Sequence, residues 1–319
     1  MIELSRAQRK SPVLTPSSLG CLTRAATVNV TAGCALGCIY CYARGYRHYP
    51  GDGKVRLYEN LPQKLRHELA HKRRLPERVV FSPSSDLFQP IPEVLETTYE
   101  LLRLLLEYGV RVSLLTKGEI PDRHLELLAR HAPLVKASIG LITVDQRILD
   151  LFEPSAATAR RRLDQIARLV GLGVPTEACV DPIIPGVTDD PDHLEELFSA
   201  LALAGIKRVV ASALFLRPAI VQGLRRHLPD REVSRRIISQ YTTQSRLRVD
   251  SGLSAVRALP VEVRKEIYSR VKTLVARHGI EARLCACKNP GVTGERCRVT
   301  TAADSPNPDR QLVQLELFK

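Results

Sequence analysis

The stretch that decides the fold is Thr27–Tyr42, which reads TVNVTAGCALGCIYCY. It begins with the alternating pattern of a short strand over residues 27–30 and runs on into a loop that contains Cys34, Cys38 and Cys41. The cysteine spacing is C-x3-C-x2-C. Three thiolates can hold three irons of a [4Fe–4S] cluster and leave the fourth iron open for a substrate or cofactor.

A structural zinc site is the alternative interpretation of the same cysteines. Zinc knuckles usually show C-x2-C pairs with a fourth ligand nearby. Here the next candidate ligand is His48, seven residues after Cys41, and no second cysteine pair surrounds it. The spacing therefore favours a cluster over a zinc loop or free thiols.

The composition indicates a cytoplasmic protein with metal or redox chemistry. The chain has 319 residues, of which 44% are hydrophobic, enough for one large domain or a domain with an appendage. No apolar run is long enough to span a bilayer, so we expect no membrane partner, and the polar start over residues 1–10 lacks the apolar core of a secretory signal. Eight cysteines in the cytoplasm favour metal or redox chemistry over disulfides.

The charge is strongly basic. A formal net charge of +13 and a pI near 9.6 are compatible with DNA or RNA as a partner. Arginines occur throughout the chain, for example at Arg225-Arg226 and Arg235-Arg236, and solvated helix faces are the alternative explanation. Aromatic residues make up 5% of the chain and Trp is missing, so no stacking platform for single strands is evident.

Strand-like and helical segments alternate after the cysteine loop. Strands separated by helices pair in parallel with right-handed crossovers, so six such units predict an α/β fold, a partial (βα)6 barrel of the TIM type with its chemistry on one rim. A doubly wound open sheet is the alternative, although no G-x-G-x-x-G follows the first strand. The expected strands cover residues 27–30, 78–81, 110–115, 136–143, 174–180 and 206–214, and the expected helices cover residues 61–71, 92–108, 158–172, 191–204, 232–240 and 261–278, with a further helix that opens at Asp122 as its N-cap.

The same pattern divides the chain into four parts. Residues 1–22 form an N-terminal extension and residues 23–218 form the partial barrel. Residues 219–299 form a helical, cysteine-containing appendage that covers the open side of the barrel. Residues 300–319 are a polar, proline-containing tail.

The segment Cys38-Ile39-Tyr40-Cys41-Tyr42, with Cys34 before it, resembles the signature of the radical S-adenosylmethionine (SAM) superfamily. Within that superfamily it resembles the spore photoproduct lyase branch, often described as DNA repair photolyases. The loop Ser84-Ser85-Asp86 and the run 49–60 resemble an actinobacterial-type subgroup of this branch. The resemblance covers residues 23–218 well and the C-terminal part only within the subgroup.

The resemblance implies a lyase-like radical SAM enzyme. In this superfamily SAM binds the open iron, and an electron from the reduced cluster cleaves it to a 5′-deoxyadenosyl radical that takes a hydrogen from the substrate. An electron donor such as flavodoxin or ferredoxin is implied as a partner. Tyrosines beside the last cluster cysteine relay a hydrogen atom in the lyase, and Tyr40 and Tyr42 stand at those positions, with packing beside the cluster as the alternative.

One position departs from the lyase pattern. The lyase donates a hydrogen from a cysteine just before its Ser-Ser-Asp-like loop, and Pro83 stands at the matching position here. Because proline has no thiol hydrogen, spore photoproduct repair by that route is not expected of this chain.

Six polar residues that end or follow successive strands are expected to contact the amino, ribose or carboxylate groups of SAM on the barrel rim, each with a turn or core role as the alternative. These residues are Ser84, Ser85, Asp86, Thr116, Lys117 and Ser138.

Alternation along the fifth strand yields a further candidate without reference to any family. A period of two puts Glu177, Cys179 and Asp181 on one face. Two acids are not expected to face a helix layer unpaired, so this face should look into the barrel. Cys179 is then a candidate hydrogen donor near the substrate, with a small buried thiol as the alternative.

A second cysteine group, Cys285, Cys287 and Cys297, predicts another metal site. Three cysteines within thirteen residues favour an auxiliary Fe–S cluster or Zn²⁺, with Cys21, His278 or a substrate as a fourth ligand and free thiols as the alternative.

These features together predict a radical SAM enzyme that acts on a nucleic acid or nucleotide. A peptide or small-molecule substrate is the second hypothesis. A non-enzymatic zinc-binding protein of the nucleic-acid class is the third.

Overall fold

The computed structural model describes residues 2–16, 22, 25–242, 246–247, 256–284, 289 and 291–294. The expected sites at Cys21, Cys285, Cys287 and Cys297, and the tail over residues 300–319, lie outside these described residues.

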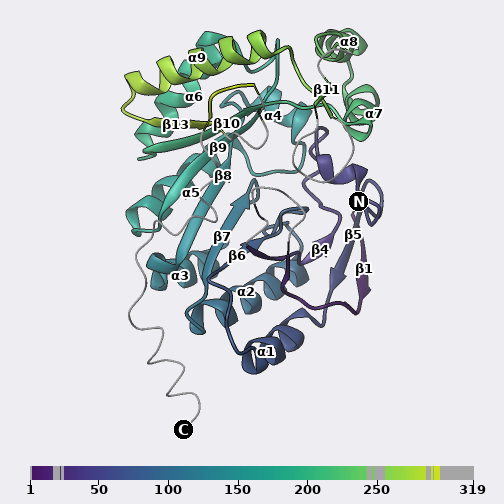
Figure 1. The fold of residues 1–319 in the computed structure, drawn as a ribbon, viewed down its shortest axis with the longest axis vertical. Helices are drawn as coiled ribbons and strands as arrows, with labels where there is room; N and C mark the ends of the chain where they lie inside the picture. The colour runs from purple at the N-terminus through teal and green to yellow at the C-terminus, as the bar shows by residue number, and fades with distance from the viewer. Residues whose placement is uncertain are drawn as a thin grey trace.

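The six expected strands form one parallel sheet, drawn diagonally in Figure 1. They pair in the order in which they occur along the chain. A doubly wound sheet would reverse this order near its middle, so the alternative is excluded and the partial (βα)6 barrel is confirmed. The strands are β3 (Ala26–Val28), β6 (Arg78–Phe81), β7 (Arg111–Thr116), β8 (Val135–Gly140), β9 (Thr176–Ile183) and β10 (Arg208–Ala213).

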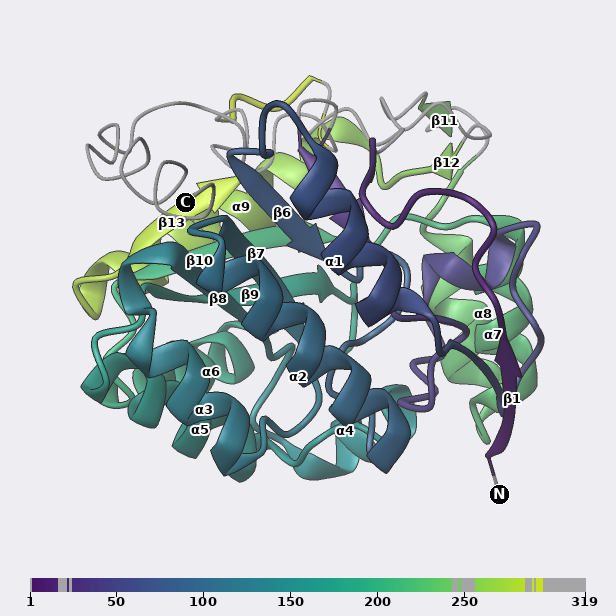
Figure 2. The same ribbon diagram turned by 90° about the horizontal axis from the view of Figure 1, so that it is seen from below.

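Helices cover one face of this sheet, and Figure 2 shows α2, α3 and α5 side by side below it. Their apolar stripes, for example Leu101, Leu102 and Leu105, are fully buried against the strands. The helix that was expected to have Asp122 as its N-cap begins at Asp122 itself. Its N-cap is Pro121, which makes no side-chain cap hydrogen bond, so the expectation is wrong by one residue. The helices of this layer are α1 (Leu61–His71), α2 (Pro92–Glu107), α3 (Asp122–Arg130), α4 (Gln146–Phe152), α5 (Ala159–Gly171) and α6 (Pro191–Leu203).

Several short strands extend the predicted architecture. β13 (Glu281–Leu284) lies parallel to β10 at one edge of the main sheet, and β2 (Thr15–Pro16) lies antiparallel to β3 at the other. A second, smaller sheet has the order β1-β5-β4, built from β1 (Glu3–Ala7), β5 (Lys54–Tyr58) and β4 (Thr31–Ala32). Strands of two to five residues carry too little alternation to be predicted from sequence.

The C-terminal part adds three helices and a two-stranded ribbon. Two of the helices match the expected ones, α8 (Arg231–Ser239) and α9 (Val261–Arg277), while α7 (Pro218–His227) fills a region whose pattern is irregular. α9 packs on α6 and β13. α7 lies against the short 3-10 helix η2 (Tyr42–Gly45), beside the cysteine loop. The ribbon consists of β11 (Arg246–Leu247) and β12 (Val256–Arg257). Among the described residues, no helix combines the length and apolar character needed to cross a membrane.

Candidate active site

The cysteine loop lies between β4 and η2, and its shape depends on glycine. Cys34, Cys38 and Cys41 are free thiols, each partly exposed. Gly33 has a φ of +82°, and a Cβ there would lie 2.3 Å from the Lys54 carbonyl oxygen on β5. Only glycine fits this close approach, so the residue before Cys34 fixes where the loop starts.

The surroundings of the thiols fit a metal cluster. Backbone N–H groups of Leu36 and Asp86 donate to the Cys34 sulfur, and those of Ala43 and Arg44 donate to Cys41. Such donors stabilise thiolates that carry iron. Burial and the neighbouring Asp86 charge raise the pKa of Cys34 to about 12, and burial also raises the pKa of Cys38 and Cys41.

A single metal ion is a different matter from a cluster. Within the part of the chain that the structure describes, no three His, Cys, Asp or Glu side chains are grouped so that they could hold one metal ion. What supports a cluster at Cys34, Cys38 and Cys41 is instead the set of N–H donors around the sulfurs and the side chains that fix the loop.

Arg44 fixes the loop from its outer side. Its Nε donates to the Cys38 carbonyl at 3.2 Å and its Nη2 to the Gly37 carbonyl at 3.2 Å, and its Nη1 pairs with Asp52. Asp52 also accepts from the Tyr49 hydroxyl at 2.6 Å and lies 3.1 Å from His227 Nε2 on α7. Burial acts to raise the pKa of Asp52, but the bonds from Tyr49, Arg44 and His227 outweigh it and lower this pKa to about 2.

Gln89 fixes the loop from the side of the sheet. Its side-chain oxygen accepts from the Ala35 N–H at 2.7 Å, and its amide donates to the Asp86 carbonyl at 2.7 Å and to the Thr31 hydroxyl at 2.9 Å. All these groups are buried, so one side chain joins the loop that follows β6 to the loop that carries the cysteines.

The three residues of the loop after β6 have different surroundings. Asp86 is buried and accepts from Thr116 Oγ1 at 2.7 Å and from the Lys117 N–H at 2.8 Å, which ties β6 to β7. Burial outweighs these donors and raises the pKa of Asp86. The Ser84 hydroxyl donates to Asn29 at 2.7 Å. By contrast, the Ser85 hydroxyl is buried with no hydrogen-bond partner among the described residues, as expected of a group that awaits a ligand.

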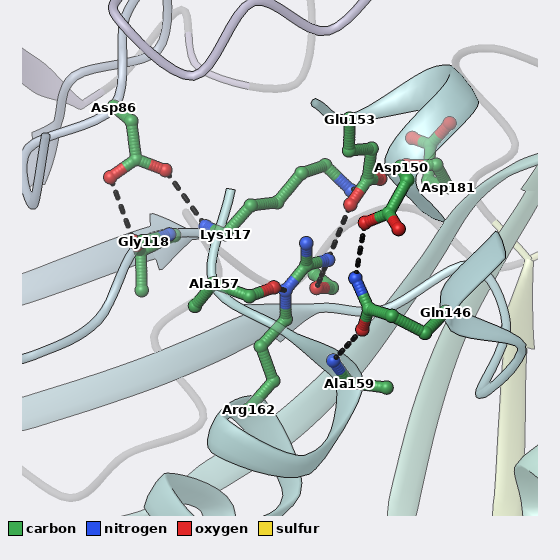
Figure 3. Close-up of polar contacts among 12 residues, drawn as sticks. Asp86, Lys117, Gly118, Gln146, Asp150, Glu153, Ala157, Ala159, Arg162 and Asp181 are labelled. Carbon is green, nitrogen blue, oxygen red and sulfur yellow. Dashed lines mark hydrogen bonds and ion pairs between the residues drawn. The ribbon is translucent and has the colours of Figure 1, made fainter. Parts of the chain in front are cut away.

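A buried ionic network adjoins the cysteine loop through Tyr40, and Figure 3 shows three of its members, Glu153, Lys117 and Arg162. The Glu153 carboxylate is fully buried, lies 3.1 Å from the Lys117 ammonium, pairs with Arg162 and accepts from the Tyr40 hydroxyl. Burial acts to raise the pKa of Glu153, but the charges of Lys117 and Arg162 outweigh it and lower that pKa. Burial, followed by the Glu153 charge, raises the pKa of Tyr40 well above its usual range. The buried Arg162 and the partly buried Lys117 therefore share one carboxylate next to Cys38, and the net charge there is positive.

Short helix α4 presents Glu153 to this network. Gln146 accepts from the Ala159 N–H at 3.0 Å and donates to Asp150 at 2.6 Å, which fixes α4 to the start of α5. Arg162 on α5 also donates to the carbonyls of Ala157 at 2.6 Å and Gly140 at 2.9 Å. The network is thus anchored to two helices and to β8.

Lys117 crosses the inner face of the sheet, the face opposite the helices. A Cβ at Gly140 would lie 2.8 Å from the lysine side chain, so the glycine leaves room for it. Lys117 Nζ lies 3.5 Å from the Asp181 carbonyl oxygen, and the ammonium group interacts electrostatically with Cys179. Cys179 is buried and lies beside Gly140 in the ladder. Burial acts to lower the pKa of Lys117, and the charges of Glu153 and Cys38 outweigh it and raise that pKa.

One position among the described residues of the inner face is exposed to solvent. Strands of a parallel sheet are normally covered on both faces, yet Leu115 on β7 is 46% exposed. Beside it in the ladder, Ser138 donates to Glu177 at 2.8 Å, and Glu177 pairs with Lys136 at 3.0 Å. The expectation that Glu177 would not be unpaired is met, because both of its partners lie on the neighbouring strand β8.

Tyr42 lies at the outer end of the loop and is 37% exposed. Its hydroxyl donates to the Pro83 carbonyl, its ring packs edge-on against Tyr46 at 5.8 Å between centroids, and the Arg217 guanidinium lies 5.9 Å from its centroid. The position at which the lyase pattern would have a cysteine is therefore in contact with Tyr42, but it offers a carbonyl and no thiol.

The structure thus brings most of the predicted residues together. The cysteine triplet, Tyr40, Asp86, Lys117 and Cys179 form one connected region, whereas Ser138 lies further down the sheet with Glu177. Sequence reasoning missed Arg44, Gln89, Glu153 and Arg162. Isolated polar residues in loops and helices give no periodic signal, and only their contacts show their importance.

Comparison with known proteins places the chain in a family. The profile of the radical SAM superfamily matches residues 28–201, more than half of the chain and the whole cysteine loop. The chain is 29% identical over 204 residues to a radical SAM Nalpha-GlyT isomerase of Pseudomonas phage M6, which covers 62% of this chain and 42% of that protein. It is 31% identical over 200 residues to an uncharacterized protein of Mycobacterium tuberculosis, which covers 60% of this chain and 59% of that protein. The chain spans about half the length of these curated relatives.

Solved structures agree on the fold. Spore photoproduct lyase complexed with dinucleoside spore photoproduct has a TM-score of 0.66 at 16% identity and covers 88% of this chain and 81% of that chain. SuiB of Streptococcus suis bound to S-adenosylmethionine has a TM-score of 0.50 at 10% identity and covers 81% and 49%. Family membership implies a [4Fe–4S] cluster and SAM, which favours a cluster over the zinc alternative at the cysteine triplet. With its cysteine loop, its sheet and this profile match, the chain belongs to the radical SAM superfamily.

Proposed function

We propose that this member of the radical SAM superfamily is an enzyme that acts on a nucleic acid or nucleotide. The observation that carries the proposal is the cysteine loop, fixed by Arg44 and Gln89, next to an inner face on which Leu115 is exposed and Lys117 lies near Cys179. The net charge of +13 supports an anionic substrate. The lyase structure with a bound dinucleoside, which shares the fold, supports the same substrate class.

In this proposal, Cys34, Cys38 and Cys41 hold the cluster. The cluster and SAM, when bound, supply a 5′-deoxyadenosyl radical. Ser85 is the best supported SAM contact, because its buried hydroxyl has no partner among the described residues. Asp86 acts on SAM indirectly by positioning Thr116 and Lys117, since protein donors occupy both of its oxygens. Lys117 keeps one ammonium hydrogen for a SAM carboxylate beyond its contacts with Glu153 and Asp181.

The proposed hydrogen donor is Cys179. It is the one cysteine outside the triplet among the described residues, and it lies on the inner face near Lys117. Tyr40 and Tyr42 are the proposed relay residues. Both hydroxyls donate to protein groups, but Tyr42 is the better placed for exchange with a substrate because it is 37% exposed, whereas Tyr40 is buried. Ser84 and Ser138 stay proposed SAM contacts, although each already donates to a protein group.

The central experiment is anaerobic reconstitution with iron and sulfide, followed by detection of 5′-deoxyadenosine with DNA present and absent. We expect about four irons per chain if only the triplet is loaded, and about eight if Cys285, Cys287 and Cys297 hold an auxiliary cluster. The Cys38→Ala variant, as a matched control, should lose the triplet's iron and all SAM cleavage. A reconstituted protein without iron or SAM cleavage would contradict the proposal.

Substrate class is tested in the same assay. Cleavage of SAM that DNA or RNA stimulates would support the nucleic-acid substrate. Cleavage that neither stimulates, together with no binding at low salt, would support the peptide or small-molecule hypothesis. A flavodoxin or ferredoxin is the proposed electron donor, and replacing it by a chemical reductant tests whether a protein donor is needed.

A further inference from the structure

Helices α7 and α8 present a basic surface next to the cysteine loop. Its members are exposed arginines from the last turn of α7 and from α8, and we name this set the α7–α8 arginine surface. The set consists of Arg225, Arg226, Arg231, Arg235 and Arg236.

The positive charge of this surface is poorly compensated within the protein. Arg226 lies 3.8 Å from Asp52, and Arg235 pairs with Glu232 at 2.8 Å. Considering the described residues only, Arg225, Arg231 and Arg236 have no carboxylate within ion-pair distance. Asp230 is already used as the cap of α8, accepting from the Glu232 N–H at 2.7 Å. Three arginines therefore keep their full charge toward solvent.

Helix physics does not account for this arrangement. Arg225 and Arg226 suit the C-terminal end of α7, where the helix dipole favours cations. Arg231, however, stands at the N-terminal end of α8, where the dipole disfavours a cation. It also stands four residues before Arg235, and like charges at that spacing repel each other. Arg231 therefore lowers the stability of α8 and makes no ion pair among the described residues in return. A residue that is unfavourable for its own helix in this way is typical of a binding site.

The surface is joined to the active site through α7. Gly223 lets α7 approach the cysteine loop so closely that a Cβ there would lie 2.3 Å from the Ile39 carbonyl oxygen. One end of α7 holds Arg217 over the ring of Tyr42, and the other end holds His227 against Asp52. A helix of 10 residues is about 15 Å long. The arginines of α7 thus begin within about one helix length of the loop.

The chemistry of the surface selects among macromolecular partners. Protein interfaces generally have an apolar core, whereas nucleic-acid interfaces are polar and strongly positive. Among the described residues, none of the exposed large hydrophobic side chains lies on α7 or α8. Guanidinium groups bind phosphate oxygens in bidentate fashion, and five of them along two helices suit a chain of phosphates.

We propose that the α7–α8 arginine surface docks the phosphodiester backbone of the nucleic-acid substrate and holds it beside the cysteine loop. This inference rests on the proposed nucleic-acid function and goes beyond it, because it names the surface that binds the backbone.

The test compares two triple variants of the full chain. The first is R225Q/R231Q/R236Q, on the proposed surface. The matched control is R66Q/R130Q/R160Q, which removes the same charge from exposed positions on α1, α3 and α5. Binding of a short fluorescent DNA duplex and of its single strand is measured by anisotropy over a series of salt concentrations. Equal iron content and equal melting temperatures of the two variants show that both are folded.

We expect the surface variant to bind DNA at least about tenfold more weakly than the control, with the slope of log affinity against log salt reduced by about 3. Equal binding by the two variants would overturn the surface while leaving the nucleic-acid function in place. If the wild-type chain binds neither DNA nor RNA at low salt, the proposed function fails with it. A loss of flavodoxin binding, with DNA binding unchanged, would assign the surface to an acidic redox protein instead.

Discussion

Two ionic networks fix the same cysteine loop, and they differ in burial. Behind the loop, Glu153 is fully buried and shared by Lys117 and Arg162. In front of it, Asp52 joins Arg44 to His227 while its side chain keeps 34% exposure. A buried ion depends strongly on its partners because no water replaces a lost one, whereas an exposed ion is solvated in any case. The Glu153 network should therefore hold the cysteine loop rigidly, with a large loss of stability when one member is removed. The Asp52 network should tolerate the loss of a member.

Removing the buried acid tests this contrast most strongly. In Glu153→Gln, the buried Arg162 and the mostly buried Lys117 lose their neutralising carboxylate, and the free energy of unfolding should fall by about 3–5 kcal/mol, measured by urea denaturation. The control is Glu119→Gln, whose exposed partner Arg161 lies 3.2 Å away, and its effect should stay below about 1 kcal/mol. Equal effects of the two substitutions would remove the distinction between buried and exposed ion pairs here.

The contact of α7 with the loop is the next strongest test. Gly223→Ala places a methyl group 2.3 Å from the Ile39 carbonyl oxygen, so α7 or the loop must move. We expect a loss of about 1–3 kcal/mol in unfolding free energy and a lower iron content after reconstitution. Gly171→Ala on α5 is the matched control, because no atom lies within 4 Å of its added Cβ. That control should be neutral or stabilising by up to about 1 kcal/mol. A Gly223→Ala protein with wild-type stability and iron content would show that α7 and the cysteine loop can move apart without loss.

The Asp52 network should respond to pH. The pKa of Asp52 is lowered from 3.8 to about 2 by its bonds to Tyr49, Arg44 and His227, so its stabilising effect is complete above pH 3.8 and is lost as the pH falls toward 2. The difference in unfolding free energy between wild type and Asp52→Asn, below about 1 kcal/mol at pH 6, should shrink below pH 4. Asp164→Asn on α5 provides a control without an ion pair in the described part of the chain. A difference that stays constant from pH 6 to pH 3 would contradict the role of the Asp52 carboxylate.

The smallest effect separates stability from binding. In Ser85→Ala, a buried hydroxyl without a partner among the described residues is removed, so the unfolding free energy should stay the same or rise slightly. SAM binding to the reconstituted enzyme should weaken by about threefold to tenfold, the worth of one hydrogen bond. Ser84→Ala, which loses a 2.7 Å bond to Asn29, should lower stability instead. Unchanged SAM binding in Ser85→Ala would remove this residue from the cofactor site.

The sequence was a good guide wherever a pattern repeats. The spacing of Cys34, Cys38 and Cys41 predicted the cluster loop, and alternation of apolar segments predicted six strands and their order. The residues that fix the loop could not be found in that way. Gln89 lies 48 residues after Cys41, and Glu153 lies 119 residues after Cys34. A single polar residue at such a distance belongs to no periodic pattern. Contacts were also needed to distinguish Ser85, whose hydroxyl has no partner among the described residues, from Asp86, whose carboxylate accepts from protein donors.

The position of β13 has a consequence for synthesis on the ribosome. This strand covers the outer edge of β10, yet the helices from Pro218 to Arg277 are made between the two. At a synthesis rate of about 5–20 residues per second, several seconds pass between the synthesis of β10 and that of β13. During this time the N–H and C=O groups along the outer edge of β10 are unpaired. A nascent chain that stops before Glu281 therefore presents an open sheet edge that can pair with another chain. Chaperone demand should peak in that interval and fall once β13 has emerged.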